Sequence, residues 1–319
     1  MSSSASRQAT EGSAARGLYQ GAYRQRVQQA VAFTLMWLVS VAVIVPAVLL
    51  VWFVASKGLP GISWRFLTAA PEQGMTAGGI FPAILGSLYL VLVTIVLSLP
   101  VGILGAVYLT EYARQGPLVR AVRLAIMNLA GVPSIVHGLF GLGLLVMVVM
   151  PALIRWLHLT PQQATPSCLL AGAGTLALLV LPMVITTTEE ALRQVPQHQR
   201  NASLALGATK WQTVRRIVLP NALPGILTGL ILAVGRAAGE TAPILLTGAV
   251  FYATHTPGPA EALLKPFMAL PYHLYAISTQ LPNAPESTKW GTALVLLALV
   301  LGFNAVAIAL RAYLRRKRN

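Results

Sequence analysis

The sequence predicts an all-α integral membrane protein with six transmembrane helices, and three observations support that fold class. The 319 residues are 56% hydrophobic and 10% charged, with a mean hydropathy of +0.70, whereas soluble domains carry about a quarter charged residues. Six apolar runs each reach the roughly 20 residues that cross about 30 Å of hydrocarbon. These runs lack alternating polar residues, and backbone polar groups cannot stay unpaired in lipid, so helices are favoured over barrel strands.

The elements are expected in the following order. Residues 1–28 form a Ser-, Arg- and Gln-rich tail that we expect to be disordered. Residues 29–79 hold a first, peripheral transmembrane helix and a Pro- and Gly-containing external loop, because an apolar run this long exceeds a signal-peptide core. Residues 80–312 form a five-helix core, followed by a basic tail at 313–319. The six predicted spans are Val31–Val54, Ile80–Leu109, Leu124–Leu153, Cys168–Thr188, Ala222–Val250 and Trp290–Leu310.

The basic residues predict the orientation of these helices. Seventeen of the 23 Lys and Arg residues lie before the first span, in alternate loops or after the last span. The positive-inside rule therefore predicts that both termini and the loop 191–221 are cytoplasmic. The net charge of +15 then reflects topology and contact with anionic lipid in the bilayer, so we expect no nucleic-acid partner.

The sequence lacks the motifs of an enzyme. It has no G-x-x-x-x-G-K-[ST] phosphate cradle, no Asp, one cysteine and five widely separated histidines. We therefore expect no catalytic residue, metal or cofactor on this chain. If ATP drives its work, a partner supplies the ATP and Mg. A secondary transporter acting alone and a membrane-embedded enzyme remain alternatives.

A polar, glycine-punctuated segment, Asn201–Pro220, lies between two apolar runs and suits contact with another protein. Gly207 is expected to be a hinge, because glycine tolerates positive φ and close backbone approach. Pro220 is expected to stop one element and begin the next. An amphipathic helix in the membrane interface is the alternative interpretation.

Two charges lie inside the fifth predicted span. Arg236 and Glu240 are four residues apart and so share a helix face, where each charge alone would cost at least about 2.5–3.5 kcal/mol. They must pair or face water. They are either a structural ion pair or a substrate site, in which the guanidinium binds an anion in bidentate fashion. His137 is expected to be packed or cavity-facing, and Asn128 to form an interhelical hydrogen bond.

Resemblance to a known family sharpens these expectations. The segment Asn201–Pro220 resembles the coupling loop of ABC-importer permeases, whose pattern places Glu-Ala-Ala, Gly, Ile and Leu-Pro at fixed spacing, with Asn201 here in place of the glutamate. Further segments look like the PstA-type permease subunit of bacterial phosphate importers: Gly78–Gly86, Gly131–Gly141, Thr186–Leu192 and Gly235–Ile244. By resemblance, the coupling residues are Asn201, Ala202, Ser203, Gly207, Ile217, Leu219 and Pro220.

This resemblance implies a type I importer in the bacterial inner membrane. The chain would form half of the pathway for inorganic phosphate. Its implied partners are a PstC-like second permease, two PstB-like ATPases that carry ATP and Mg, and a PstS-like external phosphate-binding protein. The pathway residues are expected to be Arg236 and Glu240, with His137 and Asn128 as further candidates. A permease for another oxyanion or small solute is the alternative.

Overall fold

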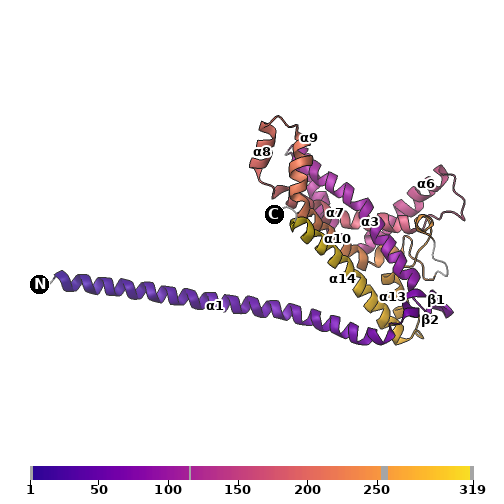
Figure 1. Cartoon of the computed structure of the whole chain (residues 1–319), viewed down its shortest axis with the longest axis horizontal. Helices are drawn as coiled ribbons and strands as arrows, with labels where there is room; N and C mark the ends of the chain where they lie inside the picture. Colours follow the sequence, from indigo (N-terminus) through magenta and orange to yellow (C-terminus); the bar gives the residue numbers. More distant parts are fainter. Residues whose placement is uncertain (1–2, 115, 253–257, 317–319) are drawn as a thin grey trace. The chain divides into compact units, whose positions relative to one another are not determined.

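The computed structural model describes residues 3–114, 116–252 and 258–316 (Figure 1). The chain divides into two units, Met1–Ser56 and Lys57–Asn319. Six helical segments in the described residues are long and apolar enough to cross a membrane, which confirms the all-α membrane fold class. They are Gln28–Gly61, Phe81–Tyr112, Ser134–Trp156, Leu169–Arg193, Lys210–Gly239 and Glu286–Tyr313.

The described residues of the first unit all belong to one long helix, α1, Ser3–Gly58, which extends two residues beyond that unit. The expectation of a disordered tail is therefore wrong for the backbone from Ser3 onward. Residues 1–30 contain no proline and are rich in Ala, Gln and Arg, which have high helix propensity, and the apolar run that follows supplies a helix to extend. The apolar side chains of the span are exposed, Trp52 by 72%, as suits a helix that faces lipid.

The second unit begins with short elements that lead into the helical core. The N-terminus of α2 is capped by Ser63, whose Oγ accepts a hydrogen bond from the Phe66 N–H at 3.1 Å. The two strands pair antiparallel around a tight turn. These elements are η1 Leu59–Gly61, α2 Trp64–Thr68, β1 Pro71–Glu72, η2 Gln73–Met75 and β2 Ala77–Gly78.

Five long helical segments form the core of this unit. Three of them contain π-helical turns, in which the backbone hydrogen bonds shift from i−4 to i−5. The segments are α3 Phe81–Val107 with η3 Tyr108–Tyr112; α5 Ser134–Phe140 with η4 Gly141–Val149 and α6 Met150–Trp156; α7 Leu169–Arg193; α9 Lys210–Thr213 with η5 Val214–Val218 and α10 Leu219–Gly239; and α14 Glu286–Arg316.

Helix α7 lies at the centre of the core, packed between α3 and α10. Its approach to α10 is close because two glycines of α10 carry no Cβ. A Cβ on Gly225 would lie 2.5 Å from the Ala191 Cβ, and one on Gly229 would lie 2.0 Å from the Thr187 Oγ1. These glycines form the small-residue spacing that lets membrane helices touch.

Two predicted spans are wrong in their bounds, and proline explains both. The third, Leu124–Leu153, is interrupted between α4, Pro117–Ala130, and α5, because Pro133 disfavours helical geometry at the residue before it. The fifth, Ala222–Val250, ends at Gly239. Glu240 is extended (φ −76°, ψ 130°), and a short helix α11, Ala242–Leu245, begins around Pro243.

The remaining elements cover one end of the core, where β1, β2 and α13 lie (Figure 1). Helix α12 spans Pro259–Ala262 and α13 spans Leu270–Thr279. The Leu270 N–H donates to the Ser87 Oγ of α3 at 2.7 Å, which fixes the start of α13. At the C-terminus, α14 continues to Arg316, so the boundary predicted at 312 lies inside a helix. Residues 317–319 of the predicted basic tail lie outside the described residues.

Candidate functional site

A helical hairpin projects from the end of the core opposite β1 and β2 (Figure 1). It consists of α8, Gln197–Ala205, a turn, and α9, and we call residues 197–213 the α8–α9 hairpin. Gly207 in the turn has φ +83°, a value that side-chain-bearing residues resist. Its N–H donates to the Leu204 carbonyl at 3.0 Å, and the Ala208 N–H donates to the Ser203 carbonyl at 3.2 Å. Gly207 thus has the positive φ for which a glycine was expected here, while its role as a hinge stays a prediction.

The second half of the turn is fixed by a capping box at the start of α9. The Thr209 Oγ1 accepts from the Gln212 N–H at 3.2 Å, and the Gln212 Oε1 accepts from the Thr209 N–H at 2.8 Å. Such reciprocal bonds satisfy two backbone donors that the helix itself leaves unpaired. The turn therefore has one defined geometry.

The tip of the hairpin presents apolar side chains to the outside of the chain. Leu206 is 90% exposed, more than any other large hydrophobic residue described, and Trp211 and Leu204 are half exposed. Exposed apolar residues that cluster on a rigid turn indicate a surface covered by another protein.

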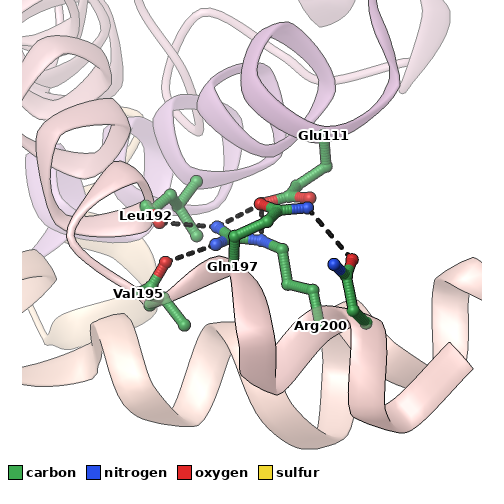
Figure 2. Close-up of polar contacts among 6 residues, drawn as sticks. Glu111, Leu192, Val195, Gln197 and Arg200 are labelled. Atoms are coloured by element: carbon green, nitrogen blue, oxygen red, sulfur yellow. Dashed lines mark hydrogen bonds and ion pairs between the residues drawn. The ribbon is translucent and has the colours of Figure 1, made fainter.

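Arg200 fastens the inner side of α8 to the core (Figure 2). Its Nη2 lies 2.9 Å from the Glu111 Oε1 of η3, and the two side chains are only 11% and 10% exposed. The same guanidinium donates to the carbonyls of Leu192, at 2.7 Å, and Val195. These carbonyls lie in the last turn of α7, where a helix leaves acceptors unpaired, and just after it. Sequence reasoning missed this residue.

Two further hydrogen bonds hold α8 against the helices that follow it. The Ser203 Oγ lies 2.9 Å from the Thr213 Oγ1 of α9, and the Asn221 Nδ2 donates to the Gln199 Oε1 at 3.0 Å. Ser203 stands where the coupling pattern has its second alanine, so this departure from the pattern gains a bond inside the hairpin. Asn201, which replaces the glutamate, is exposed, and its Oδ1 accepts from the Gln197 Nε2 at 3.4 Å.

The remaining predicted coupling residues lie on the hairpin or directly after it. Ala202 is exposed on α8, while Ile217 and Leu219 are half-buried. The expectation that Pro220 stops an element is wrong, because Lys210–Gly239 forms one continuous helical segment. The π turn at Val214–Val218 shifts the hydrogen-bond register just before the proline, which can therefore lie inside the segment despite its missing N–H.

The two charges of the fifth span meet at the end of α10. The Arg236 Nε lies 3.4 Å from the Glu240 Oε1, with the side chains 35% and 19% exposed. Arg236 is in the last helical turn, where the helix dipole favours a cation, and Glu240 caps that turn. The pair is therefore at a helix terminus rather than in mid-span as expected.

The two further pathway candidates lie on other helices. His137 of α5 is buried, with Nδ1 3.4 Å from the Pro133 carbonyl and no hydrogen-bond partner for Nε2 among the described residues. Asn128 lies on α4, and its side chain is exposed. The expected interhelical position of Asn128 is thus wrong, because the break at Pro133 separates α4 from the span. Within the described part of the chain, no group of His, Cys and Glu side chains could hold a metal ion.

Comparison with known proteins identifies the family to which this chain belongs. The family model for the binding-protein-dependent transport system inner membrane component matches residues 98–319. The phosphate transport system permease protein PstA 1 of Mycobacterium tuberculosis is 34% identical over 299 residues, which cover 92% of both chains. The probable ABC transporter permease protein YqgI of Bacillus subtilis is 32% identical over 83% of this chain and 90% of its own.

Solved structures show the same fold at low sequence identity. A bacterial alginate ABC transporter, crystallised with an alginate-bound periplasmic protein, superposes with a TM-score of 0.57 at 17% identity over 85% of this chain and 92% of its own. An inward-facing MetNI methionine ABC transporter gives 0.50 at 20% identity over 74% and 94%. With the family match and the curated relatives, this fold shows that the chain belongs to the binding-protein-dependent transport system inner membrane components, the multi-pass permeases of ABC importers.

Proposed function

We propose that the chain is the PstA-type permease subunit of an ATP-driven importer and forms half of the pathway for inorganic phosphate. The rigid α8–α9 hairpin with its exposed tip, Leu206, is the observation that carries the ATP-driven part of this function. The phosphate part rests on the relatives, because proteins named as phosphate permeases match 92% of this chain at 34% identity.

The hairpin has the features of a lever that a partner ATPase could move. Its turn is fixed by Gly207 and the Thr209 capping box, so a force at Leu206 would displace the whole hairpin. Arg200 would pass that displacement to η3 through Glu111 and to the end of α7 through two carbonyls. Because α7 packs against both α3 and α10, the core helices would move together.

The assembly we infer contains three kinds of partner. A PstC-like permease forms the other half of the pathway. Two PstB-like ATPases, which bind ATP and Mg, contact the hairpins, and a PstS-like protein delivers phosphate from outside. The hairpin and both termini then lie in the cytoplasm, and the chain resides in the inner membrane of a bacterium. The distribution of basic residues supports this orientation.

Within the pathway, we assign substrate contact to Arg236. Its planar fork can hold two oxygens of one phosphate, and 35% of the side chain is exposed in the single chain. Glu240 balances the guanidinium when no substrate is present and weakens anion binding enough for release. His137 and Asn128 remain candidates for secondary contacts.

The direct test is uptake by the reconstituted four-component complex in proteoliposomes. Radiolabelled phosphate should enter only with external binding protein and internal MgATP. Unlabelled phosphate should compete, and sulfate and molybdate at equal concentration should not. Uptake that continues without ATP would identify a secondary transporter, and equal competition by sulfate or molybdate would identify a different oxyanion importer.

A further inference from the structure

A pocket of about 720 Å³ lies between the α8–α9 hairpin and the core. It is bounded by η3, α4, α7 and both helices of the hairpin. Four of its lining side chains are cationic and one is a carboxylate: Arg123, Arg193, Arg200, Lys210 and Glu111. A concentration of positive charge in a recess of this size raises the local concentration of anions.

Part of this charge is already neutralised inside the chain. Arg200 donates hydrogen bonds to Glu111 and to two backbone carbonyls, so the charges of Arg200 and Glu111 are both paired. Glu189, which lines a neighbouring pocket, pairs with two of the four cations, its Oε2 lying 3.4 Å from the Arg193 Nη2 and 3.6 Å from the Arg123 Nη2. Two carboxylates therefore face four cations, which leaves an excess of positive charge.

Two buried donors in the pocket lack an acceptor within the described chain, and an exposed cation, Lys210, lies beside them. The Arg123 Nε and the Thr110 Oγ1 are buried and have no hydrogen-bond partner there. The exposed Lys210 places its Nζ 5.2 Å from the centre of the Tyr112 ring. Buried donors are normally satisfied, so Arg123 and Thr110 imply an acceptor from outside the chain, which Lys210 can also reach. The three come from α4, η3 and α9, and all line the one pocket.

We propose that this pocket binds a phosphate-type oxyanion, either free inorganic phosphate or the headgroup of an anionic phospholipid. A tetrahedral oxyanion offers several acceptor oxygens, which suits three donors of different elements, and charged donors make the stronger bonds. The bound anion bridges α9 to α4 and η3. It thus adds a tie between the hairpin and the core beyond those that Arg200 and Gln199 already make. The placement of the pocket on the cytoplasmic side rests on the proposed function, whereas the binding itself does not.

The test measures equilibrium binding of radiolabelled inorganic phosphate to the purified complex of both permeases and both ATPases, without the external binding protein. Every preparation carries Arg236→Gln, so that the pathway residue does not contribute. Lys210→Gln should weaken binding by about tenfold, the effect of losing one charged hydrogen bond. Thr110→Val, which has nearly the same shape, should weaken binding by a few-fold. Arg215→Gln, an exposed cation on η5 that does not line the pocket, should leave the affinity unchanged.

A second arm separates the two sources of the anion. The same complexes are placed in phosphatidylglycerol or phosphatidylcholine nanodiscs, and retained lipid is read by native mass spectrometry. Retained phosphatidylglycerol that is lost with Lys210→Gln, without phosphate binding, assigns the site to lipid. If the parent retains neither anion, or if both pocket variants match Arg215→Gln in both arms, the proposal is overturned. Should Lys210→Gln fail to assemble, Thr110→Val decides. Phosphate uptake by the wild-type complex tests the proposed function separately, since loss of this site leaves the pathway residues in place.

Discussion

Replacing Arg200 by methionine should release α8 from the core while leaving the transmembrane helices in place. The substitution leaves the Glu111 carboxylate, which is 10% exposed, without its cation and removes the donor to the carbonyls of Leu192 in α7 and Val195 just after it. Breaking a buried ion pair from one side costs about 3–5 kcal/mol. We take about 3 kcal/mol here, because this pair keeps some contact with solvent. The equilibrium constant for opening of α8 should therefore rise by about two orders of magnitude.

Amide hydrogen exchange of the purified full-length chain measures this opening segment by segment. Exchange in α8 should accelerate by about 100-fold, and exchange in the middle of α7 should not change. Adding Glu111→Gln to Arg200→Met removes the stranded charge and should recover at least half of the lost protection. Arg200→Lys keeps the charge without the planar fork and should fall between. If α8 in Arg200→Met exchanged within threefold of wild type, the buried pair would not be what holds the hairpin.

Three further predictions follow from single features of the structure. Gly207→Val should assemble normally but uncouple ATP hydrolysis from uptake, because φ +83° costs a β-branched residue about 1–2 kcal/mol although a Cβ there would meet nothing within 4 Å. Gly207→Asn, which tolerates that φ, is the control, and normal uptake by the valine variant would contradict the prediction. Arg236→Lys should lower phosphate uptake strongly at normal expression, since it loses the fork. Near-normal uptake by the double variant Arg236→Gln with Glu240→Gln would instead show that the two residues are a structural ion pair. Burial lowers the pKa of His273 from 6.5 to about 4, and neither ring nitrogen has a partner in the described chain. The unfolded chain therefore takes up the proton first as pH falls. Stability is complete above about pH 6.5 and should drop by about 2 kcal/mol at pH 5. Thermal unfolding of His273→Leu should not show this loss of stability. If the stability of the wild type and of His273→Leu fell equally with pH, the prediction would be refuted.

The six spans could be predicted because length and hydropathy are properties of each segment alone. The same is true of Gly207, since a glycine between two short helical patterns marks a positive φ without any knowledge of the rest of the fold. The breaks near Pro133 and Pro243 were within reach, because proline disfavours helix at the preceding residue, as at Val132, and cannot pair with the carbonyl four residues before it, as at Gly239. The unbroken apolar composition on either side concealed them.

Arg200 could not be found from the sequence. An arginine in a polar loop is normally solvated, and its partner Glu111 lies 89 residues away, so no local spacing links the two. The helical tail is a different case, because residues 3–28 have the composition of a soluble, weakly folded segment and gain their helix from the apolar run that follows. The ion pair depends on tertiary structure and the helical tail depends on the neighbouring helix, and the local sequence pattern contains neither.

The measurement that tests the central claim most directly is site-specific cross-linking of the hairpin tip in the assembled complex. A photoreactive probe attached to Leu206→Cys, 90% exposed, is compared with one on Trp156→Cys, 75% exposed at the end of α6, with the buried native Cys168 replaced by serine in both. We predict that the probe at position 206 cross-links to the ATPase subunit and that its yield changes when MgATP is added, whereas the probe at position 156 gives no ATPase adduct. An equal yield at the two positions, or no adduct at position 206 in a complex that hydrolyses ATP, would contradict the assignment of the α8–α9 hairpin as the surface that meets the ATPase.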